Sequence, residues 1–117
     1  MNRVPALLRI LRVLQRIDSE FPLQYAVCLA LISENEGLSL TELAQRAQLS
    51  LSTTSRIVGA LSQYRQSGRP YNLVSLKIAP DERRRKEILL TSGGRQVIAE
   101  IGTAFDVTEP SQKQARA

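Results

Sequence analysis

Two short helical segments joined by a tight turn constrain the fold of this chain more than any other feature of its sequence. Apolar residues recur at helical spacing over residues 39–47 and again over residues 51–65. Ser39 and Glu42 have the spacing of a capping box, and Ser50 is a favourable N-cap for the second segment. Helices joined by so short a turn are typical of a helix-turn-helix.

Residues 73–90 predict a β-hairpin directly after this motif. Alternating apolar residues cover Leu73–Ile78, a charged turn covers Pro80–Lys86, and Glu87–Leu90 form the returning strand. A hairpin in this position is the order of elements in a winged helix. We therefore expect a mainly α fold with a small β-hairpin, a winged helix-turn-helix.

Helical periodicity also predicts three further helices, over residues 5–19, 22–34 and 92–106. The first of them has a broad apolar stripe and a basic face formed by Arg9, Arg12 and Arg16. Such a helix packs within the protein or forms a dimer, and a membrane-surface helix is a further alternative.

The length of 117 residues fits a single domain, which we expect over residues 1–106 with the N-terminal helix as a candidate dimerisation element. Residues 107–117 show no periodicity and are expected to form a disordered tail. The aromatic content is only 4% and there is no Trp, so the core must be aliphatic. Such a core favours the packing of helix on helix.

The charge and the missing residue types narrow the function. A net charge of +5 and a pI near 10.0 suit a polyanion such as double-stranded DNA, although a solvated basic surface is the alternative. There is no His, and the single Cys28 lies in an apolar helical stretch that is typical of a core position, with redox sensing as the alternative. These residues offer no nucleophile–base pair. We expect no enzyme activity, no catalytic residue, no cofactor and no metal site.

The sequence indicates a cytoplasmic protein without a membrane partner. Its longest apolar run, Ala26–Ile32, is too short to span a bilayer. Arginines interrupt the apolar residues near the N-terminus, which excludes the apolar region of a signal peptide there.

The second helix of the motif begins with a run of hydroxyl side chains that ends in arginine, Leu51-Ser52-Thr53-Thr54-Ser55-Arg56. Hydroxyls contact phosphates or base edges, and arginine pairs bidentately with guanine in the major groove. The alternative is helix capping, which needs only one or two hydroxyls. We interpret the run as a DNA-reading surface.

Two segments of the sequence resemble one known family. Residues 38–61, LSLTELAQRAQLSLSTTSRIVGAL, resemble the helix-turn-helix of the multiple-antibiotic-resistance regulator (MarR) family of winged-helix repressors. Residues 82–95, ERRRKEILLTSGGR, resemble the wing of that family, and Leu23–Ile32 resembles the helix that precedes its motif. The helix-turn-helix pattern alone does not separate this family from other winged-helix families.

The resemblance assigns the two faces of the second helix. By position, the residues facing the major groove would be Ser52, Thr53, Ser55 and Arg56, with Ser50 at the helix start. The buried residues would be Thr54, Ile57, Val58 and Leu61. Thr54 stands where the family usually has an apolar residue, and its hydroxyl needs a partner such as the preceding helical turn.

The resemblance also implies that the wing enters the minor groove through its cationic tip, Arg83, Arg84, Arg85 and Lys86. The alternative is an edge hairpin that these charges keep soluble. The chain departs from the family in its long loop Gln63–Asn72, where Arg65 and Arg69 could reach a phosphate backbone. It also departs in its short C-terminal region, which places the usual dimer geometry in question.

We therefore expect a transcriptional regulator, a homodimeric repressor that pairs through its N- and C-terminal helices. The alternative is an architectural or accessory DNA-binding protein of a mobile element with little sequence specificity. An enzyme is the weakest alternative. No residue pattern supports a small-molecule effector, because every apolar residue also suits the core.

Overall fold

The computed structural model describes residues 2–63, 68–78 and 86–116. They form two compact units. The central unit comprises Pro22–Arg95, and the terminal unit combines Met1–Phe21 with Gln96–Ala117. The expectation of one domain over residues 1–106 stays a prediction.

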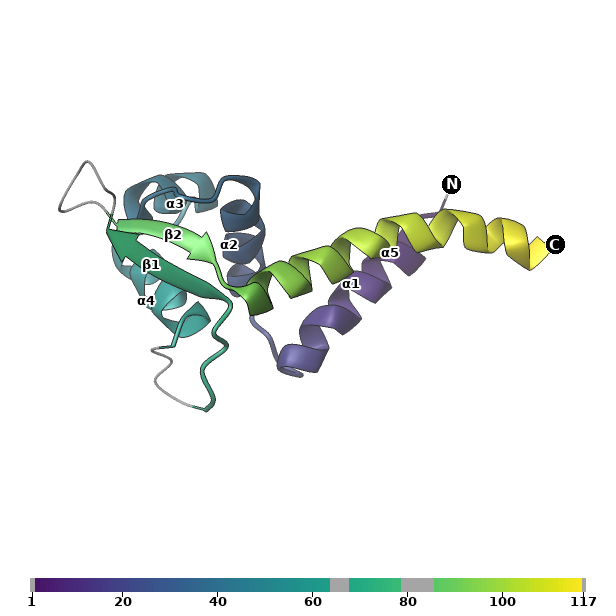
Figure 1. Cartoon of the computed structure of the whole chain (residues 1–117), viewed down its shortest axis with the longest axis horizontal. Helices are drawn as coiled ribbons and strands as arrows, with labels where there is room; N and C mark the ends of the chain where they lie inside the picture. Colours follow the sequence, from purple (N-terminus) through teal and green to yellow (C-terminus); the bar gives the residue numbers. More distant parts are fainter. Residues whose placement is uncertain (1, 64–67, 79–85, 117) are drawn as a thin grey trace. The chain divides into compact units, whose positions relative to one another are not determined.

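The central unit is a cluster of helices with a β-hairpin against it (Figure 1). Its elements are α2 (Leu23–Glu34), α3 (Leu40–Ala47), α4 (Leu51–Leu61), β1 (Val74–Ile78) and β2 (Lys86–Leu90). The strands are antiparallel, with Val74 opposite Leu90 and Ile78 opposite Lys86. The expected mainly α fold with a small hairpin is confirmed.

The core of the central unit is aliphatic, as the low aromatic content predicts. Its largest fully buried side chains are Leu29, Ile32, Leu43, Ile57, Leu61 and Ile88. Burying one such side chain contributes about 1.5–3 kcal/mol to the stability of the fold. Cys28 is fully buried among them, and its burial raises the pKa of the thiol. The cysteine therefore serves as a small apolar core residue.

Side-chain caps fix the ends of α3 and α4. The Glu42 amide donates to Ser39 Oγ at 3.1 Å, and the Ser39 amide donates to Glu42 Oε1 at 2.8 Å, which is the expected capping box. Gln48 ends α3 in the left-handed conformation, with φ of 60°. Ser50 then caps α4 by accepting from the Thr53 amide at 3.1 Å. These caps define the turn between the two helices.

Helix α4 ends at Leu61, four residues earlier than expected. The chain returns to this helix end, where the Leu73 amide donates to the Leu61 carbonyl at 2.8 Å and the Asn72 amide donates to the Ser62 carbonyl at 2.9 Å. Carbonyls at a helix end need partners from outside the helix. The returning loop supplies them here, and a local pattern does not predict such distant partners.

Strand β2 has partners on both edges. One edge pairs with β1. On the other edge, the Gly37 amide donates to the Ile88 carbonyl at 2.8 Å and the Ile88 amide donates to the Leu38 carbonyl at 3.0 Å. The loop between α2 and α3 thus lies along the second edge of the hairpin.

Glu36, in the same loop, continues this contact with its side chain. Its Oε1 accepts from the Leu90 amide at 2.9 Å and from Arg95 at 3.0 Å, and its Oε2 accepts from Arg95 at 2.7 Å. The hydrogen bond from Leu90, followed by the bonds and charge of Arg95, holds the pKa of Glu36 below its ordinary value despite partial desolvation. The carboxylate therefore joins three segments of the central unit.

The last helix, α5 (Ser92–Arg116), begins with a close backbone contact. Thr91 caps it, since its hydroxyl accepts from the Gly94 amide at 3.0 Å and donates to the Asn72 carbonyl at 2.8 Å. A Cβ at position 94 would stand 2.1 Å from the Leu73 carbonyl oxygen, whereas one at position 93 would meet nothing closer than 3.6 Å. Gly94 is therefore required for close packing at this helix start.

Helix α5 also extends further than expected. The sequence predicted its end near residue 106 and a disordered tail over residues 107–117, but the backbone is helical to Arg116. The tail residues include Gln, Lys, Ala and Arg, which favour helices. This segment lacks apolar periodicity. Such periodicity determines how a helix packs rather than whether its backbone is helical.

The terminal unit contains α1 (Val4–Ile17) beside the greater part of α5 (Figure 1). Arg16 of α1 forms an ion pair with Glu100 of α5. Ala6, Val13 and Leu14 are the buried residues of α1.

We predict that Gly94→Ala destabilises the protein by about 1–3 kcal/mol, because the added methyl group overlaps the Leu73 carbonyl and forces the backbone apart. Urea denaturation followed by circular dichroism measures the change. Gly93→Ala is the matched control and should change stability by no more than about 0.5 kcal/mol. Equal effects of the two substitutions would contradict the close contact at position 94.

We also predict a pH-dependent stability contribution from Glu36. Because folding lowers its pKa, its carboxylate stabilises the fold fully above the ordinary glutamate range, and this contribution is lost as pH falls through the lowered pKa. The difference in unfolding free energy between the wild type and Glu36→Gln should therefore be largest near neutral pH and shrink on acidification. Denaturation at a series of pH values measures it. A difference of the same size and pH dependence in Glu34→Gln, two residues away and exposed, would show that the effect is not specific to Glu36.

Candidate nucleic-acid interface

Helix α4 has one buried face and one exposed face. Its buried residues include the four that the family resemblance implied, Thr54, Ile57, Val58 and Leu61. On the opposite face Ser52, Ser55 and Arg56 are exposed, and Thr53 is half-buried. The packing of the buried face therefore fixes the direction in which the exposed residues point.

The hydroxyl run at the start of α4 both caps the helix and remains exposed. Ser50 Oγ caps the helix and also donates to Thr53 Oγ1 at 3.0 Å, while Ser50 Oγ and Ser52 Oγ lie 3.4 Å apart. Ser55 and Arg56 form no side-chain hydrogen bond or ion pair with any residue that the structure describes. The hydroxyls of Ser50, Ser52 and Thr53 thus interact with one another at the capped helix start. The side chains of Ser55 and Arg56 remain available to a ligand.

Thr54 satisfies its buried hydroxyl locally. The side chain is fully buried, and its Oγ1 donates to the Ser50 carbonyl at 2.9 Å, one helical turn back. The expectation that this threonine bonds to the preceding turn is confirmed. An apolar environment therefore accommodates this residue without an unsatisfied polar group.

The tip of the predicted wing, Arg83–Arg85, lies outside the residues that the structure describes. Lys86, the fourth expected residue of the tip, opens β2 as an exposed side chain. The loop before β1 also carries an expected phosphate contact, Arg65, which is likewise outside the described residues. Tyr71, near the end of this loop, packs edge-on against Tyr25 of α2 at 6.1 Å between ring centroids.

A groove of about 600 Å³ runs between α4 and β1. Its lining includes Ser55 and Gly59 from the helix together with Lys77 and Lys86 from the strands. A Cβ at Gly59 would meet no atom within 4 Å, so this glycine keeps the groove open and is not needed for packing. Sequence reasoning missed Lys77, although its outward position in an alternating strand is a signal that could have found it.

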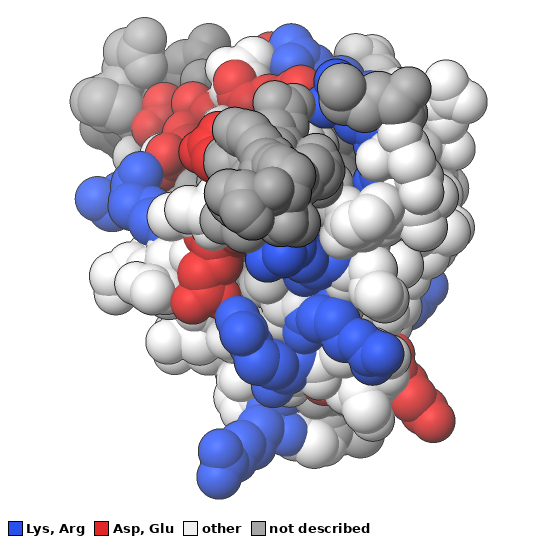
Figure 2. Space-filling model, turned by 90° about the vertical axis from the view of Figure 1, so that its right-hand side faces the viewer, with Lys and Arg blue, Asp and Glu red and all other residues white. Residues whose placement is uncertain are grey.

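Basic side chains also gather elsewhere on the protein. On the face shown in Figure 2, several Lys and Arg side chains lie next to one another. Among the described residues, no group of three or more Cys, Asp and Glu side chains could hold a metal ion. No described helix is both long enough and apolar enough to cross a membrane.

Comparison with known proteins identifies a motif within the chain and the fold as a whole. The family model of the IclR helix-turn-helix domain matches residues 27–65, which begin within α2 and include all of α3 and α4. No curated protein matches the sequence significantly. A helix-turn-helix match over this third of the chain identifies the motif and does not distinguish between winged-helix families.

Solved structures match nearly the whole chain. RV1404 from Mycobacterium tuberculosis has a TM-score of 0.73 at 19% identity, with 98% of this chain and 73% of that chain covered. MepR from Staphylococcus aureus, solved in complex with DNA, has a TM-score of 0.69 at 20% identity, with coverages of 90% and 80%. A MarR-family transcription regulator, SP03579, has a TM-score of 0.67 at 17% identity, with coverages of 97% and 68%. The chain therefore has the winged helix-turn-helix fold of MarR-family regulators, and the resemblance seen in its sequence is confirmed at the level of the fold.

Proposed function

We propose that this protein is a DNA-binding transcriptional regulator that reads its target with α4. The observation that carries the proposal is the division of α4 into a packed face and an exposed polar face with Arg56 at its centre. The major groove admits an α-helix, and an arginine there pairs with the O6 and N7 atoms of guanine. Because Ile57 and Val58 are fixed in the core, the neighbouring Ser55 and Arg56 are held in a defined orientation.

The start of α4 suits a phosphate at the edge of the groove. The helix N-terminus carries a partial positive charge, and the hydroxyls of Ser50, Ser52 and Thr53 surround it. We assign these hydroxyls to backbone contacts, and Ser55 and Arg56 to base edges. The wing residues Arg83, Arg84, Arg85 and Lys86 would contact the adjacent minor groove. The MepR structure, which shares the fold, is itself a complex with DNA.

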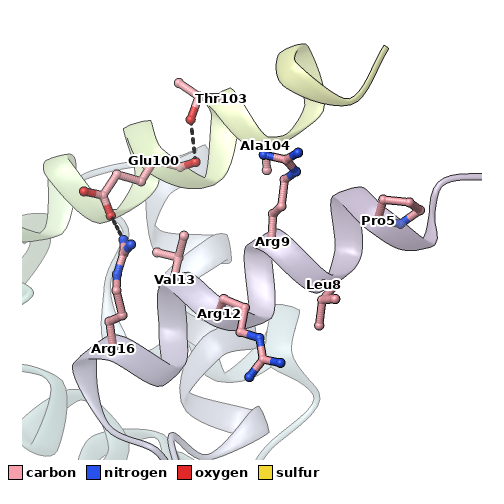
Figure 3. Close-up of a pocket in the computed structure, with 9 residues that line it drawn as sticks. All are labelled: Pro5, Leu8, Arg9, Arg12, Val13, Arg16, Glu100, Thr103 and Ala104. Atoms are coloured by element: carbon pink, nitrogen blue, oxygen red, sulfur yellow. Dashed lines mark hydrogen bonds and ion pairs between the residues drawn. The ribbon is translucent and has the colours of Figure 1, made fainter. Parts of the chain in front are cut away.

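We further propose that the protein acts as a homodimer through its terminal unit. Among the described side chains of that unit, the exposed large apolar residues are Val4, Leu7, Leu8, Leu11 and Phe105. Figure 3 shows the groove between α1 and α5, where Leu8 and Val13 line a pocket together with arginines of α1. A two-fold dimer covers such a surface and reads two half-sites about one helical turn apart. We propose that the protein is a cytoplasmic repressor in a bacterial cell. Repression then requires only that the dimer occupy a promoter.

We predict that Arg56→Ala lowers the affinity for the preferred DNA site by about 1–3 kcal/mol and relaxes the base preference at one position. Selection of bound fragments from random duplexes identifies the site, and fluorescence anisotropy gives the affinities. The matched comparison is Arg84→Ala in the wing. It should weaken binding to all sequences alike and reduce the salt slope by about one. Wild-type affinity and base preference in Arg56→Ala would show that α4 does not read the bases.

We predict that replacing Leu7 and Leu11 with lysine turns the dimer into a monomer, because both are exposed and lie one helical turn apart on α1. Analytical ultracentrifugation should show the mass falling to that of one 13.0 kDa chain. Val27→Lys is the matched control, since Val27 is as exposed as Leu11, at 43%, but belongs to the central unit. A wild-type protein that sediments as a monomer at micromolar concentration would disprove the dimer without affecting the proposed role of α4.

A further inference from the structure

Three segments of the central unit that are distant in the sequence meet at the carboxylate of Glu36. The residue itself lies in the loop between α2 and α3, Leu90 ends β2, and Arg95 lies in the first turns of α5. The hydrogen bonds to Leu90 and Arg95 span 2.7–3.0 Å. Arg95 uses two nitrogens on two carboxylate oxygens, which is the stronger and more directional form of ion pair.

The Leu90 amide depends on Glu36 for a partner. In an antiparallel pair, residues two apart direct their backbone groups to the same edge of the strand. The amide and carbonyl of Ile88 bond to Leu38 and Gly37, so the Leu90 amide points to that same edge, away from β1. The backbone contact with the loop is made at Ile88, and the carboxylate of Glu36 supplies the acceptor for Leu90. The side chain thus extends the pairing of loop and hairpin by one position.

The same contact connects the two elements to which we assign DNA contacts. The loop of Glu36 leads directly into α3 and α4, and β2 leads back to Lys86 and the wing. The glutamate side chain is 27% exposed and that of Arg95 is 59% exposed. Glu36 and Arg95 lie at the edge of the apolar core. Loss of their ion pair would therefore shift the hairpin relative to the helices and leave intact the core that holds α4.

We propose that Glu36, together with Arg95, is a positioning residue for DNA binding that sets the wing relative to the recognition helix. This inference rests on the proposed function, because it concerns how two DNA-contacting elements act on one duplex. Each phosphate contact that a protein makes adds about one to the slope of log affinity against log salt concentration. A misplaced wing loses such contacts, whereas a smaller folded fraction lowers the apparent affinity and leaves this slope unchanged.

The experiment compares Glu36→Gln with Glu34→Gln, which removes the same charge from an exposed site two residues away. Binding of each full-length variant to a fluorescein-labelled duplex carrying the selected site is measured between 50 and 300 mM NaCl, roughly the range over which phosphate contacts dominate. Removing a negative charge alone strengthens binding to DNA. We expect Glu34→Gln to bind as well as the wild type or better. We expect Glu36→Gln to bind several-fold more weakly, with a slope shallower by about one.

A charge-conserving variant tests the partner without changing the net charge. Arg95→Lys retains the positive charge and loses the two-nitrogen contact. It should also weaken binding and flatten the slope, and the double variant Glu36→Gln/Arg95→Lys should be no weaker than Glu36→Gln alone. Additive losses in the double variant would show that the two residues act separately and would overturn the proposal.

The outcome separates this inference from the proposed function. If Glu36→Gln matches Glu34→Gln in both affinity and slope, the positioning role is wrong even when the wild type selects a defined site. If the wild type selects no site, specific regulation is wrong, and the slopes measured on a random duplex still decide the role of Glu36. If the wild type does not bind DNA at all, both proposals fail.

Discussion

The packing of one face of α4 into the core is the constraint on which the rest of the structure depends. Thr54, Ile57, Val58 and Leu61 bury one face of this helix against the helices before it. The opposite face is thereby presented as a rigid polar surface, and no loop motion is needed to display it. A site built on a packed helix holds its side chains more precisely than one built on a loop. The caps and the returning loop fix the two ends of this element, while the hairpin packs against α2 and α3.

Much of this arrangement could be predicted from the sequence, because its signals are local. The capping box of Ser39, the cap at Ser50 and the apolar spacing within each helix are all contained in short windows. They predicted the helix-turn-helix, whereas the family resemblance assigned the buried and exposed faces of α4 and drew attention to the hydroxyl of Thr54, which bonds to the preceding turn. The hairpin followed from alternation in the same way, with strand ends correct to one residue.

The sequence could not predict features that depend on distant partners. Helix α4 ends early because Leu73 and Asn72 return to its last carbonyls. The need for glycine at position 94 is not visible in the sequence, because the carbonyl of Leu73, which excludes a side chain there, is remote along the chain. Nothing in the sequence distinguishes Glu36, since a single glutamate in a loop resembles any solvated charge. Its role emerges only when β2 and α5 are in place.

The contact at Glu36 also limits how this chain can change in evolution. The segment 36–38 pairs with β2 through its backbone, at Gly37 and Leu38, and through the carboxylate that precedes them. One inserted residue would move the carboxylate away from Leu90 or shift the pairing by one position, and either change would turn the hairpin relative to α3. Insertions and deletions in this short loop would therefore disrupt its pairing with β2. The loop after α4 makes its backbone contacts with the helix end through Asn72 and Leu73, so the residues at that end of the loop are constrained in the same way.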